Sequence, residues 1–202
     1  MENSKVITIL DNENFLRQVS FDIDFGDKGL ENDISYIEEF CIKNDVLAMS
    51  AIQIGIPKRL IYLKNTNLDI LKKIQTDSKT DENEKYNEAR IFINPIITSK
   101  EGLTEYWESC ASCPDKICHV MRPYSLNVEY YDKFGNKYSE NLSGFETTVL
   151  AHEIDHLDGI LHIDIADEIL TMKKEDRKIF RQTHGYNIIL KDGNFEELKL
   201  KR

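Results

Sequence analysis

The hydrophobic positions of this chain recur with both helical and strand periods, so we expect a mixture of the two elements. In residues 31–43, Ile34, Ile37 and Cys41 fall three and four positions apart, which is the spacing of the buried face of an amphipathic helix. Short apolar or alternating runs, typical of strands or extended segments, occupy residues 6–10, 21–25, 59–63 and 91–97, with Pro95 indicating an edge strand or a bend.

The second half of the chain contains a predicted hairpin followed by a predicted helix. Residues 125–131 and 137–142 read as two strands joined by a turn that contains glycine. A helix then opens at Ser143 or Glu146 and ends near Gly159, because glycine favours a helix C-terminus. Further on, residues 173–180 predict a short charged helix and residues 186–190 a last strand. This order predicts an α+β fold, with mixed or antiparallel strands packed around one central helix.

The size of the chain indicates how these elements are grouped. Its 202 residues suffice for one substantial core, so we expect a single domain over residues 1–202. Residues 65–90 are mainly charged and polar, which predicts a surface insertion. From Ile169 to the end, nine Lys and Arg residues stand against five Asp and Glu residues, so residues 169–202 form a basic extension. This extension is either a solvated helix face or a surface for an anionic partner.

Charge and hydropathy argue against two classes of function. A net charge of -10 argues against DNA binding, which needs a basic surface. No apolar run approaches the roughly 20 residues that cross a bilayer, and the first residues do not resemble a signal peptide. We therefore expect no membrane partner and a cytoplasmic location. In that compartment the four cysteines are expected to be thiols or metal ligands.

The sequence His152-Glu153-Ile154-Asp155-His156 carries the strongest chemical signal. Two histidines four residues apart lie on one face of a helix, so His152 and His156 can bind the same metal ion. Glu153 is then near enough to move a proton of a metal-bound water. The alternative is a buried helix with two hydrogen-bonded histidines. The apolar flanking residues, such as Leu150 and Leu157, bury the helix and make a buried metal site plausible.

A catalytic metal usually has three protein ligands and one open position, so a further ligand must come from elsewhere in the chain. Besides nearby carboxylates, the candidates are Cys110, Cys113, Cys118, His119 and His162. The spacing Cys110-x2-Cys113-x4-Cys118-His119 also allows a structural zinc-binding module, which is a different class of function.

Three separated stretches together resemble the peptide deformylase family. Residues 152–159 fit the family's HExDHLxG without a mismatch, residues 108–112 resemble EGCLS, and residues 46–53 resemble GxGLAAxQ. The resemblance covers about residues 7–164. It implies a metal-dependent hydrolase that removes the formyl group from N-formylmethionyl polypeptides and releases formate. It also suggests the ribosome as an anionic partner for the basic extension.

The resemblance further implies roles for single residues. Cys110 would join His152 and His156 as the third ligand of a divalent ion, for which iron(II) is expected and zinc, nickel or cobalt are alternatives. Glu153 would act as the general base, and Gln53 with the backbone N–H of Ala111 would stabilise the oxyanion. The substrate peptide would lie along Val46 and Ala48, Val149 and Phe145 would line its methionine pocket, and Glu108 and Arg122 would form an ion pair that steadies the cysteine loop.

The chain departs from the family pattern in the first two motifs. Val46 and Ala48 stand in place of two glycines, and Ser109 and Ala111 replace glycine and leucine. A Cβ at position 46 or 48 narrows or shifts the peptide groove. A divergent hydrolase with altered acyl or peptide specificity is therefore an alternative hypothesis. Without the resemblance, the favoured interpretation of Gln53 is a core amide bonded to the backbone, and Val149 and Phe145 read equally well as core residues.

Overall fold

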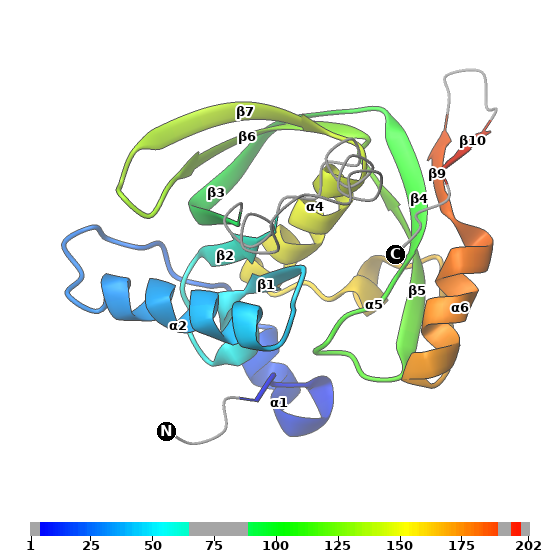
Figure 1. Cartoon of the computed structure of the whole chain (residues 1–202), viewed down its shortest axis with the longest axis horizontal. Helices are drawn as coiled ribbons and strands as arrows, with labels where there is room; N and C mark the ends of the chain where they lie inside the picture. Colours follow the sequence, from blue (N-terminus) through cyan, green and yellow to red (C-terminus); the bar gives the residue numbers. More distant parts are fainter. Residues whose placement is uncertain (1–4, 65–88, 190–194, 199–202) are drawn as a thin grey trace, which may run out of the picture.

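Two antiparallel sheets surround one helix, α4 (Phe145–Leu157), as Figure 1 shows. The computed structural model describes residues 5–64, 89–189 and 195–198, so the insertion predicted at residues 65–90 lies almost entirely outside the described residues. One sheet has the strand order β1-β2-β3-β6-β7 and the other β10-β9-β4-β5-β8. Helix α4 contacts strands of both sheets, which confirms the predicted α+β fold around a central helix.

The bounds of the elements are as follows. The first sheet consists of β1 (Ala48–Ser50), β2 (Leu60–Leu63), β3 (Arg90–Glu101), β6 (Ser125–Tyr131) and β7 (Lys137–Ser143). The second consists of β4 (Leu103–Glu108), β5 (Lys116–Arg122), β8 (Glu168–Thr171), β9 (Tyr186–Ile189) and β10 (Phe195–Leu198). The other helices are α1 (Ile9–Leu16), α2 (Leu30–Lys43), the 3-10 helix η1 (Ala51–Ile54), α5 (His162–Ile165) and α6 (Lys174–His184).

At β2 the first sheet is buried on both faces, because α2 covers one face and α4 the other. Along β2, Leu60 and Tyr62 join the core beneath α2, whereas Ile61 and Leu63 join the core around α4. This alternation is the two-residue period of a strand, and it explains why all four residues are apolar. The predicted helix over residues 31–43 is confirmed as α2, which buries its predicted stripe against this sheet.

Helix α4 ends where the sequence predicts. Its last residue is Leu157, and Gly159 follows with a φ of 74°, a conformation that glycine adopts without strain. A Cβ on Gly159 would lie 2.3 Å from the carbonyl oxygen of Arg17. Glycine therefore allows the end of α4 to meet the chain just after α1. The helix begins at Phe145, between the two predicted starting residues.

Residues 6–10 do not form the predicted strand. Helix α1 begins at Ile9, because the backbone N–H and the hydroxyl of Thr8 both donate to the Asp11 carboxylate and cap its first turn. Residues 21–25 form an extended segment rather than a strand, and one bridge from Phe21 to Lys58 ties them to the rest of the chain. Local capping thus outweighs the apolar pattern at the N-terminus.

Pro95 lies within β3, between β2 and β6, so the expectation of an edge strand is wrong and that of a bend is closer. The register with β6 shifts between Ile93 and Ile96, and Asn94 has a φ of 50°. The Asn94 side chain makes two hydrogen bonds with the backbone of Ile23, of 2.8 and 2.9 Å. The irregularity therefore serves to hold the extended segment against the sheet.

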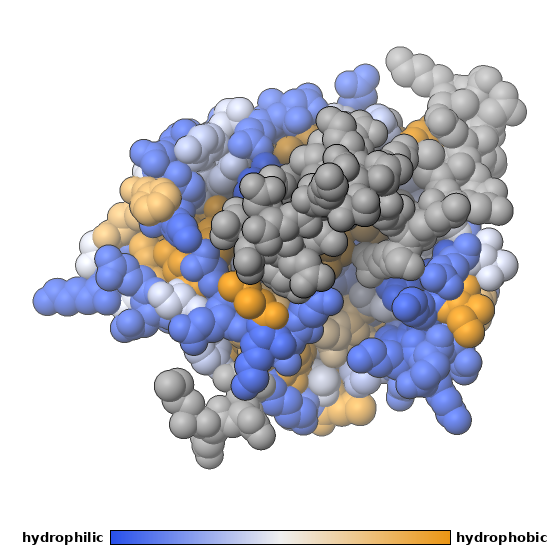
Figure 2. Space-filling view, viewed as in Figure 1, coloured by the Kyte–Doolittle hydropathy of each residue, from blue (hydrophilic) through white to orange (hydrophobic). Residues whose placement is uncertain are grey.

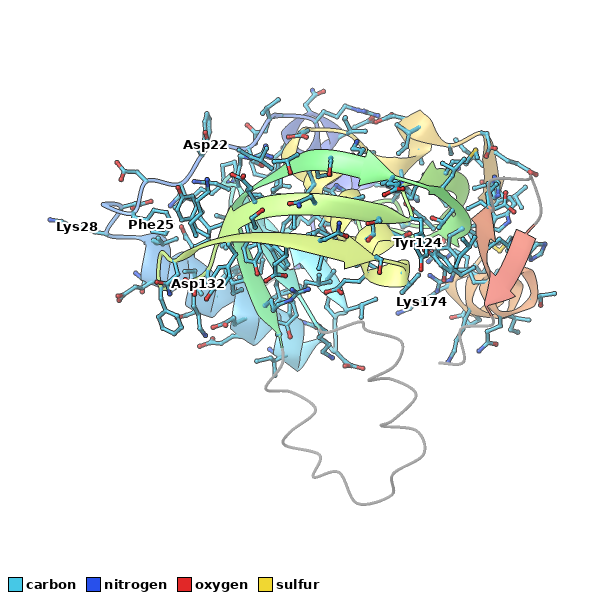
Figure 3. All side chains as sticks on the ribbon, turned by 90° about the horizontal axis from the view of Figure 1, so that it is seen from above. Asp22, Phe25, Lys28, Tyr124, Asp132 and Lys174 are labelled. Atoms are coloured by element: carbon cyan, nitrogen blue, oxygen red, sulfur yellow. The ribbon has the colours of Figure 1, made fainter. Side chains whose placement is uncertain are left out.

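The predicted hairpin is confirmed as β6 and β7. Figure 3 shows Phe25 beside Asp132 at its turn, where the Phe25 and Tyr131 rings meet at 5.1 Å. Tyr124 is labelled near its other end, where the carbonyl of Tyr124 accepts from the Gly144 N–H that precedes α4. The hairpin thus leads directly into the metal-motif helix.

The described part of the C-terminal extension belongs to the second sheet. Strand β9 pairs with β4, and α6 contacts the same strand. None of the described helices is long and apolar enough to cross a membrane. On the face shown in Figure 2, the described residues are mostly hydrophilic, with hydrophobic side chains in small groups.

Candidate active site

A cavity of about 660 Å³ opens beside α4 and contains most of the predicted site. Its walls come from β1, η1, the end of β4, the turn after it and one face of α4. All the predicted site residues except His156 line it, namely Val46, Ala48, Gln53, Cys110, Ala111, Phe145, Val149, His152 and Glu153. Segments far apart in the sequence therefore converge on one cavity.

Cys110, His152 and His156 form a group whose potential ligand atoms all lie within 4.8 Å of one another. Helix α4 places the two histidines one turn apart, and the turn after β4 places Cys110 with its Sγ 3.1 Å from Nε2 of His156. A hydrogen bond from Cys113 and the nearby His156 hold the pKa of the Cys110 thiol well below its usual range. One thiolate and two imidazoles form a donor set that fits a divalent ion of borderline softness.

The orientation of His152 is fixed by a buried carboxylate. Glu108 accepts a hydrogen bond of 2.8 Å from Nδ1 of His152, which leaves Nε2 free to bind an ion. Arg122 donates to both oxygens of Glu108, at 2.8 and 3.0 Å, as predicted, and also to Asp155. Burial alone would raise the pKa of Glu108, but the Arg122 charge and the His152 hydrogen bond outweigh it and lower the pKa to about 2. Glu108 is therefore a fixed negative charge behind the histidine.

The amide of Gln53 has a defined orientation. Its Oε1 accepts from the backbone N–H and the hydroxyl of Ser50, at 3.1 and 3.0 Å. Its Nε2 consequently faces the cysteine turn, where it donates to Ser112 Oγ at 3.0 Å and reaches Cys110 Sγ at 3.5 Å. Ala111 lies on the same turn, at the cavity wall. Gln53 is thus a buried amide that directs its N–H groups toward the candidate metal ligands.

Glu153 lies on α4 between the two histidines and faces the cavity. It is buried, and within the described part of the chain no hydrogen-bond partner is found for its Oε2. Burial raises the pKa of the Glu153 carboxyl. A buried carboxyl without a partner for one oxygen is suited to exchange a proton with a molecule in the cavity.

The apolar part of the cavity contains the residues predicted for a side-chain pocket. Phe145 and Val149 lie two turns and one turn before His152 on α4. The Phe145 ring packs edge-on against Tyr106 at 5.3 Å. Ala48 is the first residue of β1 and Val46 lies just before it, and both also line the cavity. An extended peptide beside β1 would therefore pass between an apolar pocket and the polar group around Cys110.

The ligand set predicted for a structural zinc module, Cys110, Cys113, Cys118 and His119, is wrong, because the structure does not bring these four side chains together. Cys118 and His119 are consecutive on β5 and therefore point to opposite faces of the strand. Nδ1 of His119 donates to the Asp167 carboxylate at 2.7 Å rather than facing the cysteines. In the described ranges, Cys113 instead forms a second compact group with Cys110 and His162.

Other residues of the site, some of them behind the cavity wall, were not expected from the sequence. Ser50 and Ser112 fix the Gln53 amide, and they carry no signal beyond their positions in the two weaker motifs. Lys5 and Arg181 line the cavity from the two ends of the described chain. Arg181 comes from α6, more than sixty residues after the cysteine turn, so no local pattern could have assigned it to the site.

Comparisons with known proteins identify the family of this chain. The family model for polypeptide deformylase matches residues 5–172. A peptide deformylase of Rhizobium meliloti is 35% identical over 83% of this chain and 86% of its own length, and one of Pelagibacter ubique is 37% identical over 61% and 63%, respectively. The crystal structure of a probable peptide deformylase from Synechococcus phage S-SSM7 has a TM-score of 0.65 and 32% identity, over 80% of this chain and 99% of that one. The chain therefore belongs to the peptide deformylase family, whose members are metal-dependent amidohydrolases that remove the N-formyl group from nascent polypeptides.

Proposed function

We propose that this chain hydrolyses the formyl group of N-formylmethionyl peptides, with Cys110, His152 and His156 as the ligands of a divalent ion. The observation that carries the proposal is the convergence of one cysteine and two histidines in a cavity that also contains Glu153 and Gln53. Iron(II) suits this mixed sulfur and nitrogen donor set, and zinc, nickel and cobalt are the alternatives. When bound, the ion acts as a Lewis acid that polarises a carbonyl and lowers the pKa of a water molecule.

Glu153 holds and moves the proton in this mechanism. Its carboxylate takes a proton from the attacking water and delivers it to the amine that leaves from the formyl carbon. The buried environment raises the pKa of Glu153, which brings the carboxyl closer to the range in which it can both accept and release a proton. One oxygen of Glu153 has no hydrogen-bond partner among the described residues, so it is available to exchange a proton with the water and the substrate.

Gln53 and Ala111 stabilise the negative charge that develops on the formyl oxygen. The Ser50 hydrogen bonds fix the Gln53 amide before the substrate arrives, so its Nε2 is held on the side of the cysteine turn, where the oxyanion would form. The backbone N–H of Ala111 supplies a second donor from the cysteine turn. One preorganised donor of this kind is worth about 2.7–4 kcal/mol in other acyl-transfer enzymes.

The substrate peptide lies beside β1, along Val46 and Ala48, and its methionine side chain enters the pocket of Phe145 and Val149. Phe145 and Val149 exclude water from this pocket, and an unbranched methionine fits an apolar wall of this kind. The side chains at positions 46 and 48 support a second candidate, a deformylase-like hydrolase with altered acyl or peptide preference, since they occupy part of the groove.

The decisive test is the substitution Glu153→Gln, which keeps the size of the side chain and removes its base. We expect formate release from a formyl-Met peptide to fall by about 10²–10⁴-fold, with the metal content unchanged. Glu146→Gln is the matched control, because Glu146 lies on the same helix but pairs with Arg90 away from the cavity. Full activity in Glu153→Gln would refute the proposed role of this residue.

The proposal for the basic extension is a contact with the ribosome in the cytoplasm. The exposed Lys174 and Lys178 of α6 support it, since they present positive charge beside the cavity-lining Arg181. Figure 3 labels Lys174 at the surface of the molecule. Co-sedimentation with ribosomes should weaken in the double variant Lys174→Glu/Lys178→Glu, and unchanged binding would exclude this surface.

A further inference from the structure

We propose that Cys110 and Cys113 form a reversible disulfide when the site meets a hydroperoxide, and that Cys113 thereby protects Cys110 from irreversible oxidation. Formation of the bond does not require the proposed function. Its effect on catalysis rests on the proposed function, in which Cys110 is a metal ligand.

The turn after β4 places the two cysteines at the distance that a disulfide needs. Cys110 and Cys113 are its first and fourth residues, and the Cys113 N–H donates to the Cys110 carbonyl at 3.2 Å. The ends of such a turn lie within about 7 Å of each other at Cα, and disulfides span about 4.4–6.8 Å. The two Sγ atoms already lie within 4.8 Å of each other. Closing the bond therefore requires side-chain rotation and only a small backbone adjustment.

The two cysteines differ in their access to the cavity, and this difference determines which sulfur reacts first with the oxidant. Cys110 lines the cavity, so a small oxidant that enters the cavity meets this cysteine. Cys113 is fully buried and does not line the cavity, so it meets Cys110 and not the oxidant. Cys41 belongs to the core beneath α2, and Cys118 lies on β5. Cys113 is thus the thiol placed to resolve an oxidised Cys110.

The chemistry proceeds in two balanced steps. The Cys110 thiolate attacks one oxygen of the hydroperoxide, the O–O bond breaks, and the products are a Cys110 sulfenate and an alcohol or water, which takes up the proton. The Cys110 sulfenate takes up one proton from water and becomes the sulfenic acid. The Cys113 thiol then attacks the sulfur of this sulfenic acid, the S–O bond breaks, and the hydroxide leaves as water with the proton of the thiol. Two electrons pass in total from the two sulfurs to the hydroperoxide. A thiol reductant returns these electrons by thiol–disulfide exchange.

The disulfide removes the sulfur ligand from the candidate metal group. A sulfur in a disulfide is no longer a thiolate, so only His152 and His156 remain of the three ligands. The bound ion is therefore released when the bond forms. Conversely, an ion on the Cys110 sulfur occupies the electron pair that attacks the oxidant, so the metal-loaded protein reacts more slowly than the metal-free protein.

The test uses the full chain loaded with zinc, which has no redox chemistry of its own, and the same chain stripped with a chelator. Both are treated with hydrogen peroxide, and the products are read by intact mass, by peptide mapping and by zinc release. We expect the wild type to lose two hydrogens, to map a Cys110–Cys113 bond, to release zinc and to recover fully with dithiothreitol. The stripped protein should react at least several-fold faster.

Two variants separate protection from mere oxidation. In Cys113→Ser, Cys110 should gain two or three oxygens and fail to recover with dithiothreitol; Cys113→Ala serves if the serine variant does not fold. Cys118→Ser is the matched control and should behave as the wild type. Sulfinate or sulfonate at Cys110 in the wild type, or a bond between another pair, would overturn the proposal. A correct disulfide without formate release by the reduced protein would refute only the proposed function.

Discussion

Removing the guanidinium of Arg122 should destabilise the protein far more than removing a surface arginine. Only 5% of the Arg122 side chain is exposed, and the same holds for Glu108. Arg122 donates two hydrogen bonds to Glu108 and one to Asp155. In Arg122→Ala the Glu108 carboxylate stays buried without its compensating charge, with the hydrogen bond from His152 as its remaining contact.

The magnitude follows from this burial. Breaking a buried ion pair on one side costs about 3–5 kcal/mol, because the remaining charge is left uncompensated. For a protein of this size each kcal/mol lowers the melting temperature by about 2–4 °C, so a shift of about 6–20 °C is expected. The loss of this support for His152 should also weaken metal binding by about 10–100-fold.

The assay is urea unfolding of the metal-free protein, so that metal binding does not add to the free energy of unfolding. Arg17→Ala is the control, because Arg17 also pairs with a carboxylate, that of Asp164, but its side chain is 35% exposed. The loss of this exposed ion pair should lower the free energy of unfolding by about 1 kcal/mol or less. Replacing both charges, in Glu108→Gln/Arg122→Met, should recover most of the loss. A cost below about 1 kcal/mol for Arg122→Ala would refute the reasoning.

Three further predictions concern acid stability, the end of α4 and the groove. The pKa of Glu108 is lowered to about 2 in the folded protein, so the ionised carboxylate adds about 3 kcal/mol to the free energy of unfolding above pH 4.5. This contribution is lost as the pH falls toward 2, and Glu108→Gln should remove that part of the pH dependence. Gly159→Ala should lower the free energy of unfolding clearly more than Gly55→Ala. Both glycines have a positive φ, but only a Cβ at position 159 would collide with backbone, at 2.3 Å from the Arg17 carbonyl oxygen. Equal losses in the two variants would show that the contact at position 159 relaxes. Val46→Gly with Ala48→Gly should raise kcat/KM for formyl-Met peptides at least several-fold if the second candidate function is right, and unchanged kinetics would count against it.

The sequence predicted the centre of the molecule better than its edges, and the reason is physical. The metal-motif helix depends on local signals, namely the apolar flanks that bury it and Gly159 that ends it, and the structure agrees with both. The apolar run at residues 6–10 was misleading, because the Thr8–Asp11 cap starts a helix there. A short apolar segment can be buried as a helix or as a strand, so a single capping interaction decides which of the two forms.

The residues of the candidate site also differ in how well the sequence predicts them. The spacing of His152 and His156 is a local signal. Cys110 was one of several candidate cysteines and histidines, and only the resemblance to a family distinguished it from the others. Arg181 could not be predicted, because β9 and α6 return to β4 through long-range pairing that leaves no periodic trace. Residues that long-range strand pairing brings to the cavity can therefore be identified only from the folded structure.

The central claim is that Cys110, His152 and His156 together hold the ion that deformylation requires. It is tested most directly by measuring metal content and formate release on one anaerobic preparation, for the wild type and for Cys110→Ser, with Cys118→Ser as the control. The wild type and the control should bind one divalent ion per chain and release formate from a formyl-Met peptide, whereas Cys110→Ser should lose both. Undiminished metal binding and formate release in Cys110→Ser would contradict the account.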